Sequence, residues 1–424
     1  MRTCLLISAY FPPMGGIGVQ RIAKLTKHLP QTGWRPVVVT SPSWSFRMLK
    51  DPSLLEEMPA DLEIHRPFYF DSRKILPGDL ARLISPLEKR LFFPDKFRIW
   101  NSFVMKWLES RPGGLGAEVV LINVPPFSGL DLCERIRNEF RIPVVVHMRD
   151  AFSFNNYLLL DPDPAAAGRA ADMERRAFSA ADRLVFATPY MKRQYGELFP
   201  ECVAKMAVVT NGYDEDDFDG IGSARSAEAQ PAGGSAFTIG YNGSFSRLAP
   251  MGPLVDAICG IYETRRIRMM LNIATNVPLR RFRDKFPKLF EYGLVDFRGF
   301  LPHRESLRNL ARSHVLAFMF ANSAATEGAY SGKVFEYLRI GRPILLLHRR
   351  DSEIAGLIAE TGAGTTVDIE DPDEIAGVLL QHHALWEAGR LRHEPDLEKI
   401  RAFDYRDLTL RLSKIFDEAA EKRP

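Results

Sequence analysis

Cysteine and long apolar runs are both scarce in this chain. Its four cysteines are far apart in the sequence and form no CxxC pair, which argues against a disulfide framework or a zinc ribbon and is typical of reduced thiols. No run of about 18 apolar residues occurs, so no membrane-spanning helix is predicted. The apolar start of the chain is short and is interrupted by Pro12 and Pro13, which argues against a signal peptide. We therefore expect a cytoplasmic protein.

The chain also lacks a strong excess of charge of either sign. It has 56 Lys and Arg residues against 53 Asp and Glu residues, for a net charge of +3, which is too even for nucleic acid to be the main partner. Hydrophobic residues make up 46% of the 424 residues, as expected of a globular rather than a disordered protein. At about 150 residues per domain, the length predicts two or three domains.

Short β-branched runs alternate with helix-length segments along the chain, which predicts parallel α/β sheets. Several of these runs are continuously apolar, as is typical of strands that helices cover on both faces. We expect strands at Thr3–Ser8, Pro36–Thr40, Val119–Val124, Pro143–Met148, Arg183–Ala187, Met206–Thr210, Phe237–Tyr241, Met269–Ala274, Val295–Gly299, Val315–Phe320, Pro343–Leu347 and Gly364–Ile369.

The strand pattern occurs twice, on either side of Ser223–Ser235, a small, polar segment typical of a loop or linker. We predict a first Rossmann-like domain over residues 1–222 and a second over residues 236–402. Residues 403–424 have helical periodicity and are expected to form an amphipathic helix that packs back on the first domain. Ligands of such sheets bind at the carboxyl ends of the strands, so a cleft between the two domains is the expected site.

A glycine-rich loop, with Gly15, Gly16 and Gly18, follows the first predicted strand. Backbone amides in such a loop, and at the start of the helix after it, can approach an anion, which suits a phosphate or a sugar. The dinucleotide fingerprint would need a glycine at Arg21 and an acidic residue after the second strand, and the chain has neither, so NAD is disfavoured. The alternative interpretation is a turn that only requires positive φ.

The most informative segment of the second half is residues 330–344. Ser331 is expected to cap a helix that Gly341 ends. The free amides at the start of this helix and the Lys333 ammonium would face a diphosphate, and the two carboxylate oxygens of Glu336 suit a ribose diol. The alternative interpretation is an i,i+3 Lys–Glu pair on a solvated helix, worth only about 0.2–0.5 kcal/mol.

The chain resembles the GT-B glycosyltransferases of family 4 (group 1), of the polysaccharide-biosynthesis type, over nearly its whole length. The resemblance implies an α/β GT-B fold, with two Rossmann-like domains facing a central cleft. The motifs that carry it follow the family's order: AYFPPMGGIGVQR (9–21), GWRPVVVT (33–40), HMRD (147–150), TNGYD (210–214), YNGSFS (241–246), VDFRGFLP (295–302), SGKVFEYLRIGRPILLL (331–347) and TGAG (361–364).

The resemblance implies that the protein transfers a sugar from a nucleotide-diphosphate sugar to an acceptor hydroxyl, with retention of the anomeric configuration and without a metal or other cofactor. Gly15 and Gly16 match the loop that lines the cleft near the donor phosphates. Arg247 matches a basic residue that neutralises the leaving diphosphate, although the basic residue usual shortly after it is missing. The acceptor would be a sugar or a lipid-linked sugar of a cell-surface polysaccharide or glycolipid.

In the second half, Ser331, Gly332 and Lys333 match the segment beneath the diphosphate. Glu336 matches the second glutamate of the family's paired-glutamate motif, which binds the nucleotide ribose. Lys333 and Arg247 are therefore candidate catalytic groups as well as donor-binding groups. Stabilising the charge that develops on the leaving diphosphate is the largest task that such groups perform.

The chain departs from the family at the first glutamate of the pair. The family pattern places that glutamate at Gly328, whereas the nearest acid is Glu327, one position earlier. A subgroup acting on bacterial surface polysaccharides has a similar KxxEY form without the first glutamate. The departure leaves two other functions open: a nucleotide-sugar epimerase of GT-B shape, which would need carboxylates beside the sugar ring, and a non-catalytic GT-B subunit that binds a partner.

The end of the fifth predicted strand, HMRD, carries candidates for the acceptor side. Many family members have a histidine here, and the best match places Arg149 at its position. Asp150 is a candidate to orient an acceptor hydroxyl, and His147 is a second catalytic candidate; the alternative is a buried Arg149–Asp150 pair that closes the strand end. The acidic run Asp214–Asp217 is expected to be a solvated surface turn, and no metal site is predicted.

Basic and aromatic residues are interleaved in the span His65–Leu108, which holds nine Lys and Arg residues against four Asp and Glu residues. This mixture suits an anionic membrane surface, and the protein is therefore a candidate for peripheral attachment to the inner face of the membrane. Lys89 and Arg90 would contribute to binding. The alternative is that the aromatic residues belong to the core of the first domain, beneath a solvated basic face.

Overall fold

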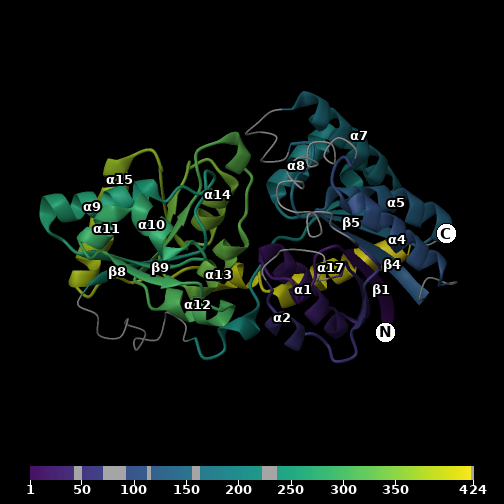
Figure 1. Ribbon diagram of the computed structural model, residues 1–424, viewed down its shortest axis with the longest axis horizontal. Helices are drawn as coiled ribbons and strands as arrows, with labels where there is room; N and C mark the ends of the chain where they lie inside the picture. The colour runs from purple at the N-terminus through teal and green to yellow at the C-terminus, as the bar shows by residue number, and fades with distance from the viewer. Residues whose placement is uncertain (43–49, 70–91, 112–115, 155–162, 222–235, 422–424) are drawn as a thin grey trace. The chain divides into compact units, whose positions relative to one another are not determined.

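The computed structural model describes residues 1–42, 50–69, 92–111, 116–154, 163–221 and 236–421. The segment Ser223–Ser235, expected to be a linker, lies outside these residues, as do Lys89 and Arg90. The chain divides into two compact units, each built on one sheet (Figure 1): unit 1 comprises Met1–Asn211 and Tyr405–Pro424, and unit 2 comprises Gly212–Asp404. The sequence suggested that the first domain extends to residue 222, whereas the first segment of unit 1 ends at Asn211.

The sheet of unit 1 has seven parallel strands in the order β3-β2-β1-β4-β5-β6-β7. The strand order reverses between β1 and β4, and the crevice at such a switch point is where sheets of this kind bind ligands. The strands are β1 (Arg2–Ser8), β2 (Trp34–Val39), β3 (Glu63–His65), β4 (Ala117–Val124), β5 (Val144–Met148), β6 (Arg183–Phe186) and β7 (Met206–Val208).

Helices cover both faces of this sheet, because each inner strand is apolar on both sides. In β1, Leu5 and Ile7 face one core cluster, while Cys4 and Leu6 face another. The second cluster is closed by α1 and the C-terminal helix α17, which lie side by side (Figure 1). The helices of unit 1 are α1 (Ile17–His28), α2 (Ser53–Glu56), α4 (Phe97–Glu109), α5 (Asp131–Arg135), α7 (Pro164–Ala180), α8 (Pro189–Leu198) and α17 (Tyr405–Ala420).

The sheet of unit 2 repeats this topology with six parallel strands in the order β10-β9-β8-β11-β12-β13. Its switch point lies between β8 and β11, so the loops after these strands frame the expected ligand-binding edge. Together the two sheets confirm the predicted α/β class with two Rossmann-like sheets. The strands are β8 (Phe237–Asn242), β9 (Met269–Ala274), β10 (Val295–Gly299), β11 (Val315–Met319), β12 (Ile344–Leu347) and β13 (Gly364–Val367).

Two apolar clusters, one on each face of the sheet, form the core of unit 2. Among the described residues, no helix is both long enough and apolar enough to cross a membrane. The helices of unit 2 are α9 (Gly252–Arg265), α10 (Leu279–Lys285), α11 (Pro287–Glu291), α12 (His303–Ala311), α13 (Gly332–Ile340), α14 (Glu353–Glu360), α15 (Pro372–Glu387) and α16 (Leu397–Arg401), with the 3-10 turn η8 (Glu215–Phe218) near the start of the unit.

The described aromatic residues of the span His65–Leu108 contribute mainly to the core of unit 1. Tyr69, Phe97 and Trp100 are buried, and the rings of Tyr69 and Phe97 stack with their centres 4.8 Å apart. Phe68 is exposed and meets the half-buried Phe103 edge to face. The core interpretation therefore accounts for these buried rings, and attachment to a membrane surface stays a prediction.

Candidate functional site

The loop after β8 holds the ammonium group of Lys333 close to its backbone. A Cβ atom built on Gly243 would lie 1.8 Å from Nζ of Lys333, so a larger residue there would displace the ammonium group. Gly243 also has φ +121°, a conformation that favours glycine. Burial lowers the pKa of Lys333, and the neighbouring Glu336 carboxylate opposes that effect. A partly desolvated cation at this sheet edge attracts an anion more strongly than a cation in water.

Helix α13, which carries Lys333 and Glu336, is fixed from both sides. Its buried residues, Val334, Phe335, Tyr337, Leu338 and Ile340, pack into the core of unit 2. The Tyr337 hydroxyl accepts a hydrogen bond of 3.0 Å from the backbone N–H of Asn242, at the end of β8. Arg339 on the outer face donates hydrogen bonds from Nε and Nη2 to the two carboxylate oxygens of Glu215 in η8. Because α13 is held at these points, the groups on its first turns have defined positions.

The start of α13 differs in one detail from the expectation. Ser331 takes the N-cap position with extended backbone, and Gly332 is the first helical residue, but the Ser331 side chain makes no capping hydrogen bond. Ser331 therefore occupies the predicted cap position, although its hydroxyl makes no capping hydrogen bond. Gly341 ends the helix in the left-handed conformation with φ 75°, as predicted. No acidic residue lies in the first turn, so the amides there keep their preference for an anion.

The Glu336 carboxylate is held by a histidine that the sequence interpretation missed. Nε2 of His303, the first residue of α12, lies 2.8 Å from Oε1 of Glu336. Nδ1 of the same ring lies 3.7 Å from Oδ2 of Asp217 in η8. His303 directly follows the motif VDFRGFLP, at the carboxyl end of β10, and that position after a strand was the signal that could have identified it.

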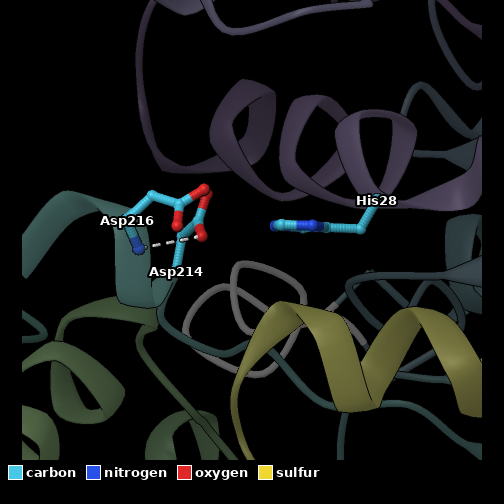
Figure 2. Close-up of side chains that lie close together, drawn as sticks. All are labelled: His28, Asp214 and Asp216. Carbon is cyan, nitrogen blue, oxygen red and sulfur yellow. Dashed lines mark hydrogen bonds between the residues drawn. The ribbon is translucent and has the colours of Figure 1, made fainter. Parts of the chain in front are cut away.

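The turn η8 is not the solvated surface turn that was expected from its acidic run. Asp214 and Asp217 are only 2% and 3% exposed. The Asp214 carboxylate accepts a hydrogen bond of 3.3 Å from the backbone N–H of Asp216 and caps the turn (Figure 2). Figure 2 also shows His28, which belongs to helix α1 of unit 1. Within unit 2 the run has two further partners: Glu215 pairs with Arg339, and Asp217 faces His303.

The remaining donor-side candidates lie in less enclosed surroundings. Arg247 is exposed in the loop after β8, at the same sheet edge as Gly243. Glu327, the acid nearest to the position of the missing first glutamate, is half-buried, and its backbone carbonyl accepts a hydrogen bond of 3.2 Å from the N–H of Glu353. A role of Arg247 in binding the donor stays a prediction.

In unit 1 the glycine loop leads into α1 as expected. Gly15 is buried, and Gly16 is the N-cap of α1 with φ 104°. The first turn of α1 contains no acidic residue and has no side-chain cap. Gly18 has a separate requirement, since a Cβ atom there would lie 1.9 Å from Nη1 of Arg149. The guanidinium of Arg149 therefore rests against the first turn of α1.

The three candidates at the end of β5 differ in exposure. The Arg149 side chain is 18% exposed and lies 3.3 Å from the carboxylate of Asp150, whose side chain is 54% exposed. A carboxylate this open does not form the buried closing pair that was the alternative interpretation. Asp150 is therefore accessible to a substrate, whereas His147 is fully buried.

His147 belongs to a buried polar network around Arg21, which the sequence interpretation did not identify. Nη2 of Arg21 lies 2.5 Å from Nε2 of His147 and also donates to the backbone carbonyl of Val209, while Nη1 donates to Oδ1 of Asn211 at 3.0 Å. Burial lowers the pKa of Arg21 to about 10, and burial next to Arg21 and Arg149 holds the pKa of His147 well below 6.5. Neutral His147 can thus accept a hydrogen bond from Arg21, and its catalytic role stays a prediction.

The chain was compared with known families and solved structures. Residues 15–212 match the family of glycosyl transferase 4-like domains. No significant match was found among curated proteins. Sucrose-phosphate synthase (tll1590) from Thermosynechococcus elongatus has 14% identity and a TM-score of 0.66, with 98% of both chains covered.

Anabaena Alr3699/HepE in complex with UDP and glucose has 14% identity and a TM-score of 0.57, covering 98% of this chain and 100% of that one. WaaG, a glycosyltransferase involved in lipopolysaccharide biosynthesis, has 14% identity and a TM-score of 0.58, with 99% of both chains covered. A protein from Listeria monocytogenes proposed to be a UDP-N-acetylglucosamine 2-epimerase has 13% identity and a TM-score of 0.54, covering 100% and 98%. The chain therefore has the GT-B fold of these solved structures, and its residues 15–212 match the glycosyl transferase 4-like domain.

Proposed function

We propose that the protein is a retaining glycosyltransferase that moves a sugar from a nucleotide-diphosphate sugar to an acceptor hydroxyl of a cell-surface polysaccharide or glycolipid. The observation that carries the proposal is the arrangement on α13, where Lys333 lies against Gly243 and Glu336 lies one turn further on. A cation and a carboxylate at this spacing suit a diphosphate and the adjoining ribose.

The donor half of the reaction needs charge stabilisation. Cleavage of the bond between the sugar and the diphosphate leaves negative charge on the diphosphate, which preorganised donors stabilise. Lys333, the amides at the start of α13 and the exposed Arg247 supply such donors. These groups neutralise the leaving group without a metal ion, so we expect turnover to persist in EDTA.

On the acceptor side, Asp150 is the group that we assign to the acceptor hydroxyl. Its side chain is open to solvent, while the neighbouring Arg149 keeps it close to the first turn of α1. Aligning the hydroxyl with the reacting carbon supplies a large part of the rate of such a transfer. Two proteins of similar fold, one solved in complex with UDP and glucose and one involved in lipopolysaccharide biosynthesis, favour a UDP-sugar donor and a surface-polysaccharide acceptor.

The function is tested with a panel of UDP-, GDP- and ADP-sugars. A bound donor raises the melting temperature by mass action, and the donor so identified is then assayed for hydrolysis and transfer with and without EDTA. Glu336→Ala is expected to abolish turnover, whereas Glu305→Ala, which removes an exposed carboxylate from α12, serves as the matched control. NMR of the product anomer reports retention or inversion. Normal turnover by Glu336→Ala would show that the site is assigned wrongly.

The same assay separates the two alternative functions. The fold of the Listeria monocytogenes protein is the reason to test for an epimerase. An epimerase would interconvert nucleotide sugars without an acceptor, and the sugar would remain attached to the nucleotide. A non-catalytic subunit would bind a nucleotide sugar, if at all, without releasing nucleotide diphosphate. Release of nucleotide diphosphate together with a glycosylated acceptor supports the transferase.

A further inference from the structure

The ring of His303 lies between two carboxylates from different elements. Oε1 of Glu336 on α13 is 2.8 Å from Nε2, and Oδ2 of Asp217 in η8 is 3.7 Å from Nδ1. The His303 and Glu336 side chains are 21% and 19% exposed, and the Asp217 side chain is 4% exposed. The His303 ring therefore lies between the buried carboxylate of Asp217 and the carboxylate of Glu336, which is still accessible to solvent.

The number of carboxylates to which the imidazole can donate depends on its protonation state. A neutral ring has one N–H and one lone pair, so it would turn a lone pair toward one of the two carboxylates. The imidazolium can direct an N–H toward both. Other charged groups near this cluster include Arg304, whose Nε lies 3.9 Å from Oδ1 of Asp217, and Lys333, which acts on Glu336 from the same helix. The Asp214 carboxylate also lies within 4.8 Å of that of Asp217.

We propose that His303 is a positioning residue for the donor: it holds Oε1 of Glu336, so that the carboxylate presents its other oxygen to the ribose hydroxyls of the donor nucleotide. The inference rests on the proposed function, in which Glu336 binds the ribose. A free glutamate can adopt several side-chain rotamers, and ordering them on binding costs free energy. With Glu336 already oriented by His303, less of that cost remains when the nucleotide binds.

A consequence of the proposal is that His303 contributes to binding only when the ligand has ribose hydroxyls. A structural role in unit 2 would instead weaken the binding of every nucleotide to the same extent. Comparing a ribonucleotide with its 2′,3′-dideoxy counterpart therefore separates the two roles. A hydrogen bond to a charged group contributes enough to change affinity by about tenfold or more.

The experiment uses isothermal titration calorimetry on the full chain. UDP, GDP, ADP and CDP are titrated into the unmodified protein, and the tightest binder is paired with its 2′,3′-dideoxy form. We expect His303→Ala to weaken the ribonucleotide about tenfold and the dideoxynucleotide less than twofold. His303→Gln, which can still donate to Glu336, is expected to restore most of the affinity. Arg308→Ala, which removes an exposed charge from the same helix, is the matched control.

A double variant tests whether His303 affects nucleotide binding through Glu336. In a Glu336→Ala background, His303→Ala is expected to cause no further loss of ribonucleotide affinity, because the carboxylate that it positions is gone. Equal losses for both nucleotide forms, no loss at all, or additive effects in the double variant would overturn the role of His303. If no nucleotide binds the unmodified protein, or Glu336→Ala leaves ribonucleotide binding intact, the proposed function of the site fails first.

Discussion

Replacing Glu174 with glutamine is expected to make the stability of unit 1 less dependent on pH. Glu174, on α7, is 0% exposed. Its Oε1 accepts hydrogen bonds from the Tyr195 hydroxyl and, at 3.2 Å, from the backbone N–H of Ser153, while Oε2 has no hydrogen-bond partner among the described residues. Burial raises the pKa of this carboxyl from 4.5 to about 7.

The sign of the effect follows from the direction of that shift. Below about pH 4.5 the carboxyl is protonated whether the chain is folded or unfolded, so it adds no pH dependence. Between about pH 4.5 and pH 7 the folded protein holds the proton more tightly, so stability falls as the pH rises. Above pH 7 the full cost of ionising a buried carboxyl is present, on the order of 3 kcal/mol.

Glutamine stays neutral at every pH and keeps an oxygen that can accept from Tyr195 and Ser153. Its amide N–H groups need partners, which adds a cost that does not vary with pH. The stability of Glu174→Gln relative to the unmodified protein should therefore increase by about 2–3 kcal/mol between pH 5 and pH 8. A difference in unfolding free energy that is the same at every pH does not affect this change.

The measurement is urea unfolding at pH 5, 6, 7 and 8, followed by tryptophan fluorescence. Four of the five tryptophans precede residue 212, so the signal reports mainly on unit 1. Glu197→Gln, which makes the same chemical change at an exposed position on α8, is the control. A stability difference that stays constant from pH 5 to pH 8 would refute the assignment of Glu174 as a proton-holding buried acid.

Two further predictions concern close contacts. Gly243→Ala would place a methyl group 1.8 Å from Nζ of Lys333, so turnover of the donor should fall at least tenfold; Gly260→Ala, on α9 with open space around its Cβ position, should leave turnover in a coupled assay unchanged. Arg21→Met removes the donors that hold His147 and two carbonyl oxygens in the core, and should lower the urea midpoint of unit 1 by an amount equivalent to roughly 1–3 kcal/mol. An unchanged midpoint would contradict the stabilising role of that network.

The parallel sheets could be predicted from the sequence because their strands are apolar on both faces. Runs such as Val119–Val124 and Pro343–Leu347 are bounded by turn residues, and β4 and β12 occupy these positions. The missed strand is β3, with the sequence Glu63-Ile64-His65. It lies at the edge of the sheet and pairs on one side only, with β2, so the sequence carries neither the length nor the apolar pattern of an inner strand.

The site was predictable only where a motif directly follows a strand. Glu336 and Lys333 lie on the helix that their spacing indicated, and Gly341 ends that helix. His303 and Arg21 were missed because their roles depend on partners that are distant in the chain: Glu336 lies 33 residues from His303, and Asn211 lies 190 residues from Arg21. Periodicity reports on neighbours along one helix or strand and contains no information on such pairs.

The segment that follows Asn211 shows why the acidic run was misinterpreted. A run of four acidic residues has the composition of a solvated turn, and composition alone does not reveal which cations lie opposite. In the structure these residues lie near the start of unit 2. There Glu215 pairs with Arg339, and Asp217 faces His303. Both partners lie on the helices that carry or orient Glu336. Because Glu215 and Asp217 each meet a basic side chain on these helices, these two acids help to fix the geometry of the candidate donor site.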